Sequence, residues 1–185
     1  MIKETIADAE SRMTKSLESL HRDLNTVRTG RASPSLLDRI QVDYFGTPTP
    51  LNQMAGVSVP EARLLVIQPW DKGIIPDIEK AIMKSDLGIT PSNDGQVIRI
   101  AIPQLTEDRR KQLVKVVHSH VEDAKVSVRN VRRDSMGQIR ELMNEKLISE
   151  DDERRAEQQI EDLTKRFVDE ADKIGKAKEQ EVLEV

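Results

Sequence analysis

The sequence predicts an α+β protein in which a long three-helix bundle carries an inserted small β/α/β domain. All eight prolines lie between Pro34 and Pro103, together with five of the eight glycines. Proline breaks the interior of a helix and glycine weakens it, so long helices are confined to the two flanks. Apolar residues in both flanks recur every three or four positions, which is the spacing of one helix face. We therefore expect residues 1–30 and 105–185 to form the bundle and residues 31–104 to form the inserted domain.

Each flank carries narrow apolar stripes with recognisable helix ends. The first stripe runs from Ile2 to Val27, and Gly30 is placed to end that helix. The second helix begins at Thr106, a suitable N-cap followed by two acidic residues, and runs for roughly 40 residues, or ~60 Å. The third begins at Ser149 with a capping-box pattern. Helices with one apolar stripe each must bury it against one another, which predicts a bundle.

The inserted segment predicts short strands, a turn, a helix and a loop. Alternating or continuous apolar runs predict strands at 40–45, 64–67 and 97–102. Residues 46–50, Gly-Thr-Pro-Thr-Pro, predict a turn, and residues 87–95 predict a loop. Helical spacing covers 74–85, with Pro76 suited to the first turn.

Composition and motifs exclude several classes of function. Charged residues make up 34% of the chain, and no apolar run approaches the ~20 residues of a membrane span, so we expect a soluble protein. The N-terminus lacks the apolar region of a signal peptide, and the absence of cysteine excludes disulfides and thiolate chemistry, which favours the cytoplasm. No phosphate-binding loop, nucleophile elbow or metalloprotease motif is present. His118 and His120 lie on different sides of a helix, and the acids at 150–153 fit a helix start. We therefore predict no catalytic, cofactor or metal site.

The charge is unevenly distributed along the chain. The net charge of −4 hides a segment, 109–140, with nine Lys/Arg and three Asp/Glu, a net of +6. The segment that follows, 141–185, has eight Lys/Arg and fifteen Asp/Glu, a net of −7. On a helical wheel seven of the nine basic residues of 109–140 share about one third of the circumference. This basic stripe consists of Lys111, Lys115, Lys125, Arg129, Arg132, Arg133 and Arg140.

The basic stripe has two interpretations. Arginine presents a planar, permanently charged fork that suits phosphate, and Arg28 and Arg31 could extend the stripe. No aromatic residue interleaves with it, so we expect folded RNA read by backbone and shape rather than stacked single strands. The alternative is a solvated face, or one paired with the acidic third helix. Gly137 interrupts the same helix, and we interpret it as a tolerated surface glycine rather than a point where a partner approaches.

Six segments of the chain, in order, resemble the bacterial ribosome recycling factor family. They are residues 27–37 (VRTGRASPSLL), 44–51 (YFGTPTPL), 85–89 (SDLGI), 105–110 (LTEDRR), 128–134 (VRNVRRD) and 149–155 (SEDDERR). Each is modest alone, but together they span the chain at the overall length of the family. One departure is Gln104, where many members have a proline.

The resemblance implies an L-shaped arrangement of the two domains and a role in translation after termination. It implies a monomeric factor, not an enzyme, that acts with elongation factor G and GTP to split the post-termination ribosome. The bundle would lie across the A and P sites of the large subunit on 23S rRNA, and the inserted domain would face elongation factor G. It implies no cofactor, and no membrane or DNA partner. The rRNA contacts carried over by position are Arg132, Arg129, Arg133, Arg28, Arg31, Arg109 and Arg110. The implied hinge comprises Gly30, Arg31, Pro103, Gln104 and Leu105.

Two other classes of function remain as alternatives. A coiled-coil adaptor would use its arginines only to pair with the acidic helix, and would bind no RNA. A hydrolase would need converging titratable groups in the middle domain. Its candidates, Asp71, Asp77 and Glu79, have no histidine or cysteine nearby in the sequence.

Overall fold

The computed structural model describes residues 1–85 and 87–184, which form two compact units. The bundle unit comprises Met1–Arg28 and Glu107–Glu184, and the small unit comprises Thr29–Thr106. The α+β class is confirmed: the first unit consists of long helices and the second holds strands and a short helix. The chain passes between the units at 28/29 and 106/107, each two residues from the boundary expected from the sequence.

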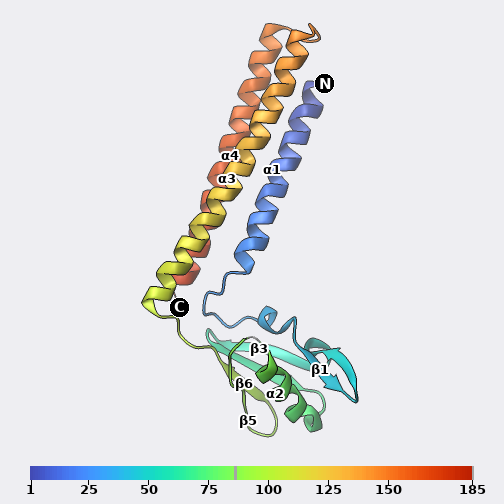
Figure 1. Ribbon diagram of the computed structural model, residues 1–185, viewed down its shortest axis with the longest axis vertical. Helices are drawn as coiled ribbons and strands as arrows, with labels where there is room; N and C mark the ends of the chain where they lie inside the picture. Colours follow the sequence, from blue (N-terminus) through green and yellow to red (C-terminus); the bar gives the residue numbers. More distant parts are fainter. Residues whose placement is uncertain (86, 185) are drawn as a thin grey trace. The chain divides into compact units, whose positions relative to one another are not determined.

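Three helices form the bundle unit and run side by side (Figure 1). They are α1 (Ile2–Asn25), α3 (Glu107–Asn144) and α4 (Glu150–Leu183). The expected end of the first helix was wrong by several residues, because the turn after Asn25 tightens. The amides of Thr26 and Val27 donate to the carbonyls of Asp23 and Leu24, at 3.2 and 3.0 Å. Gly30, with φ of 78°, lies beyond this turn.

The core of the bundle consists of the apolar stripes that the residue spacing predicts. In α1 the buried residues are Ala9, Met13, Leu17, Leu20 and Leu24. In α3 they include Leu113, Val117, Val121, Val128 and Ile139, and in α4 Ala156, Ile160, Leu163, Phe167 and Ala171. Each fully buried aliphatic side chain stabilises the fold by about 1.5–3 kcal/mol relative to an exposed one, so this continuous seam holds the helices together.

The predicted capping box at the start of α4 is confirmed. The Ser149 hydroxyl accepts a hydrogen bond from the Asp152 amide at 3.1 Å, and the Asp152 carboxylate accepts one from the Ser149 amide at 3.2 Å. These bonds satisfy donors that the first turn of a helix leaves free. The bond from the Ser149 amide lowers the pKa of Asp152 below its usual value.

The described residues of the small unit, 29–85 and 87–106, form two antiparallel sheets and one α-helix. The larger sheet has the order β3 (Ala55–Glu61), β4 (Leu64–Pro69), β6 (Ile98–Ala101) and β5 (Ser92–Asn93). The other pairs β1 (Gln41–Tyr44) with β2 (Thr47–Pro50). Helix α2 (Ile75–Lys84) buries Ile75, Ile78 and Ile82 in a core to which both sheets contribute, among others with Val42 of β1, Leu65 of β4 and Ile98 of β6.

Three features of the small unit differ from the sequence-based expectation. Residues 46–50 are not a turn throughout, because Thr47–Pro50 pairs with β1 and only Phe45 and Gly46 make the reversal. A two-stranded ribbon leaves its outer edges unpaired, which is where prolines are tolerated in strands. Strand β3 was missed because, of its seven residues, only Ala55 is buried, so no apolar alternation marks it. The expected loop at 87–95 contains the short strand β5.

A carboxylate organises the turn between β5 and β6. Asp94 accepts hydrogen bonds from the amides of Gln96 and Val97, both at 2.9 Å, and from the Arg99 guanidinium at 3.0 Å. The two backbone bonds, with Arg99, lower its pKa to about 2. The ionised form is therefore the one that the folded turn favours.

We expect this turn to loosen only in strong acid. Because the folded pKa is depressed, the stabilisation is present above the ordinary value of 3.8 and is lost as the pH falls from 3.8 toward 2. Amide-exchange protection at Gln96 and Val97 should fall over that range. Asp94→Asn keeps a side-chain acceptor but cannot titrate, so its protection should stay flat; an identical fall in both proteins would contradict the assignment.

Candidate nucleic-acid interface

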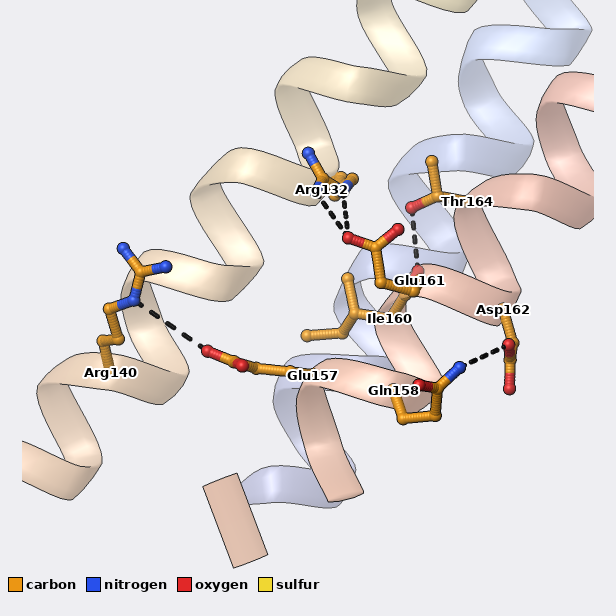
Figure 2. Close-up of polar contacts among 8 residues, drawn as sticks. All are labelled: Arg132, Arg140, Glu157, Gln158, Ile160, Glu161, Asp162 and Thr164. Atoms are coloured by element: carbon orange, nitrogen blue, oxygen red, sulfur yellow. Dashed lines mark hydrogen bonds and ion pairs between the residues drawn. The ribbon is translucent and has the colours of Figure 1, made fainter. Parts of the chain in front are cut away.

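Helix α3 presents its polar side chains in three directions, and the first is toward α4. Arg132 donates from Nε to Glu161 at 2.8 Å and pairs with the same carboxylate through Nη2. Arg140 approaches Glu157 at 3.9 Å, as Figure 2 shows. Lys125 pairs with Asp172 at 2.5 Å. Part of the predicted basic stripe therefore lies along the α3–α4 seam.

The ion pairs along this seam differ in how far their side chains are shielded from solvent. Lys125 is largely covered, with 14% of its side chain exposed. Its bond to Asp172 raises its pKa above the usual value. Arg132 and Glu161 are 41% and 46% exposed, and exposed ion pairs contribute only about 0–1 kcal/mol. Arg132 is therefore held loosely enough to exchange Glu161 for another anion.

The second direction is toward α1. Asp134 accepts from Arg12 of α1 at 2.9 Å, and the hydroxyls of Ser127 and Ser16 lie 2.7 Å apart. The first contact turns Asp134, the acidic residue that directly follows Arg133, toward α1 and away from Arg132. The negative charge of Asp134 is thereby neutralised away from the arginines.

The third direction is toward solvent. Arg129 and Arg133 are exposed and form no ion pair among residues 1–85 and 87–184, and the same is true of Lys115. Arg129 and Arg133 flank the loosely held Arg132 in sequence. We name these three residues the arginine face. It offers fixed positive charge on a rigid helix, which is the chemistry that binds phosphate.

Of the other four predicted contact residues, three lie near the ends of the bundle helices. Arg28 is exposed in the connection after α1, and Arg109 donates to Gln112 at 3.2 Å in the first turn of α3. Arg110 is half-buried, and its Nε is covered without a hydrogen-bond partner among the described residues. Arg31 belongs to the small unit.

The connections between the units contain all five residues expected to form the hinge. Residues 26–33 and 102–106 lie outside the helices and strands. The first connection is fastened by the Ala32 amide, which donates to the Ala62 carbonyl at 2.7 Å, and the second by the Ile102 amide, which donates to Arg63 at 2.8 Å. Both are thus attached to the same turn between β3 and β4. The five hinge positions lie between these two bonds and the helices of the bundle.

Sequence reasoning did not single out Glu161, Glu157 or Asp172 as partners of the basic stripe. It offered pairing with the acidic third helix only as a general alternative. The partners are 29 residues apart for Arg132 and Glu161, and nothing in the local pattern marks them. Their one common signal is that each directly follows a buried residue of the apolar seam of α4, namely Ala156, Ile160 or Ala171.

Comparison with known proteins decides the family. The model of the ribosome recycling factor family matches residues 20–183. A ribosome-recycling factor of Thermomicrobium roseum is 58% identical over 185 residues, which cover all of both chains. One of Syntrophomonas wolfei is also 58% identical over the full length of both.

The chain belongs to the ribosome recycling factor family.

Solved structures of the family agree with this assignment and with the fold. A solution structure of the ribosome recycling factor has a TM-score of 0.75 and 41% identity, over 100% of this chain and 98% of that one. A T. thermophilus ribosome recycling factor has a TM-score of 0.64 and 46% identity, over 99% of each chain. That factor is described together with E. coli elongation factor G, bound to the E. coli post-termination complex. Family membership places this chain in ribosome recycling, a step of translation.

Residues 1–85 and 87–184 include no group of three or more histidine or acidic side chains arranged to hold a metal ion. No helix among them has an apolar stretch long enough to cross a lipid bilayer.

Proposed function

We propose that this member of the ribosome recycling factor family splits the post-termination ribosome together with elongation factor G and GTP, so that the ribosome leaves the mRNA. The observation that carries the proposal is the solvent-facing arginine face on a long, proline-free bundle. Family membership supports the process, and the T. thermophilus relative supports the partner. In this proposal GTP hydrolysis belongs to the partner, and this chain is a binding protein without chemistry of its own. We propose that it acts as a monomer in the cytoplasm.

The arginine face anchors the bundle on 23S rRNA across the A and P sites of the large subunit. A guanidinium has five N–H donors, and Glu161 engages Arg132 only through Nε and Nη2. The Nη1 group is left for a phosphate oxygen. Arg129 and Arg133 add two charges that no described acid neutralises. The residues Arg28, Arg31, Arg109 and Arg110 extend the contact near the hinge.

The bundle then serves as a lever. Helix α3 has 38 residues, which corresponds to ~57 Å at 1.5 Å per residue. The small unit faces elongation factor G, and load passes through Gly30, Arg31, Pro103, Gln104 and Leu105 into the bundle. The bundle has a continuous hydrophobic core and no proline, so it resists bending. A displacement of one end of the bundle is therefore transmitted to its other end.

The adaptor alternative is supported only by the pairs of α3 with α4. Within the basic stripe those pairs involve Lys125, Arg132 and Arg140, whereas Arg129 and Arg133 have no such partner among the described residues. A purely internal role leaves these two charges without an explanation.

Binding to purified large ribosomal subunits across a salt series tests the anchor, and a subunit-splitting assay with elongation factor G and GTP tests the whole function. Phosphate contacts release counterions, so the affinity should fall steeply as salt rises. Absence of binding at low salt would overturn the anchor and favour the adaptor. Binding without splitting would overturn the recycling role alone.

We expect Glu161→Gln to bind large subunits about two- to fivefold more tightly than the wild type. The carboxylate competes with phosphate for Arg132, and an exposed pair of this kind is worth up to about 1 kcal/mol. Glu10→Gln is the matched control, because it breaks an exposed α1–α4 pair with Arg166 at 2.9 Å, away from the arginine face. Equal effects of the two variants would show a general charge effect instead.

A further inference from the structure

The aromatic side chains of the small unit all lie at its surface. Phe45 is 89% exposed, Trp70 72% and Tyr44 40%. In the bundle unit, by contrast, Phe167 is 5% exposed. Aromatic rings are the largest apolar groups available to a core, and the small unit builds its core from aliphatic residues instead. Phe45, the most exposed of the three, therefore contributes little to folding.

Phe45 also occupies a backbone position that does not suit it. The β1–β2 hairpin closes with Tyr44 opposite Thr47, so Phe45 and Gly46 form a two-residue loop. Their φ angles are 52° and 83°. Positive φ at both central residues is the type I′ turn, whose preferred sequence is Asn-Gly or Asp-Gly. A bulky residue at positive φ is strained, and such strain is a pointer to function.

Nothing else in the described chain uses the Phe45 ring. Its one ring contact is with the neighbouring Tyr44, edge to face, at 4.6 Å between centroids and 75° between planes. The hairpin therefore presents a pair of aromatic rings on a strained tip. Exposed aromatic residues that pack into a partner's pocket are the usual anchors of protein interfaces.

The charge of this part of the chain identifies the kind of partner. Between Arg39 and Arg63 the sequence contains no lysine or arginine, and it contains two acids, Asp43 and Glu61. Binding to nucleic acid depends on cations that neutralise phosphates, so rRNA is a poor partner for this tip. A protein with an apolar pocket and a neutral or basic rim fits it.

We propose that the tip formed by Tyr44, Phe45 and Gly46 docks into an apolar pocket of elongation factor G. The inference rests on the proposed function, which places the small unit toward that factor, and it names the element and the anchor residue. The arginine face of the bundle unit serves rRNA, whereas the uncharged tip serves the protein partner.

The decisive variants are Phe45→Asn and Phe45→Asp. Both install residues that the turn prefers, so the hairpin should fold at least as well, and thermal unfolding checks this. Met83→Gln is the matched control, because it removes an exposed apolar side chain, 58% exposed, from α2 in the same unit. Each protein is assayed for splitting of purified post-termination ribosomes over a range of elongation factor G concentrations at saturating GTP, and separately for binding to ribosomes without that factor.

We expect both Phe45 variants to raise the concentration of elongation factor G needed for half-maximal splitting by roughly tenfold or more, as for an interface anchor. Binding to ribosomes alone should not change, and Met83→Gln should behave as the wild type. The inference is overturned if splitting is unaffected, if ribosome binding alone falls, or if Met83→Gln shifts the curve equally. A wild-type protein that does not split ribosomes at any concentration of the factor would instead refute the proposed function.

Discussion

Replacing Arg129, Arg132 and Arg133 together with alanine should lower the affinity for large ribosomal subunits by roughly a hundredfold or more, because charge-assisted hydrogen bonds contribute about 1.5–3 kcal/mol each. The salt dependence should weaken as well, with its slope reduced by about two to three, because three side chains no longer neutralise phosphates. Arg132→Ala alone should account for part of the loss. The fold should remain intact, since the pair with Glu161 is exposed and Arg129 and Arg133 are not packed in the core.

The control for this experiment removes the same charge from another helix. Lys3, Lys15 and Arg22 of α1 are exposed and form no ion pair among the described residues. Their triple alanine variant has the same net charge as the arginine variant. If both variants lose equal affinity, binding follows overall charge and not the arginine face; if neither loses affinity, the anchor is wrong.

Two glycines inside the long helices should respond in opposite ways to alanine. At Gly137 of α3 an added Cβ would meet nothing within 4 Å. Gly137→Ala should therefore stabilise the bundle by about 1 kcal/mol through helix propensity. At Gly175 of α4 the added Cβ would clash with Val121 Cγ2 of α3. Because valine is stiff about χ1, Gly175→Ala should cost about 1–3 kcal/mol of overpacking, which exceeds or cancels the propensity gain.

Thermal unfolding of the two variants measures the contrast directly. For a chain of this size 1 kcal/mol corresponds to roughly 2–4 °C in the midpoint, so the two melting temperatures should differ by several degrees, with Gly175→Ala the lower. Far-ultraviolet circular dichroism follows the bundle, which holds most of the helix. A Gly175→Ala protein as stable as Gly137→Ala would mean that α3 and α4 do not pack as closely as the structure indicates.

The same glycines show where reading the sequence succeeds and where it stops. The interruption at Gly137 is visible in the sequence, but a glycine at a close helix contact and one facing open space look alike there. Only the rotation of α4 against α3 sets Gly175 beside Val121. Strand β3 was missed for a related reason, since its pairing with β4 and not its own pattern makes it a strand.

Elements that depend on local chemistry can be predicted from the order of residues alone. The spacing of apolar residues specifies the helices, the prolines confine the inserted segment, and Ser149 and Asp152 begin α4 as a capping box. Which positive charges of α3 remain available to a partner depends instead on how the helices pack. Acidic residues of α4 pair with Lys125, Arg132 and Arg140. Arg129 and Arg133 face solvent. Helical periodicity gives the angle of each side chain about its own axis. Which residue of another helix lies next to that side chain is decided by the packing of segments that are far apart in the sequence.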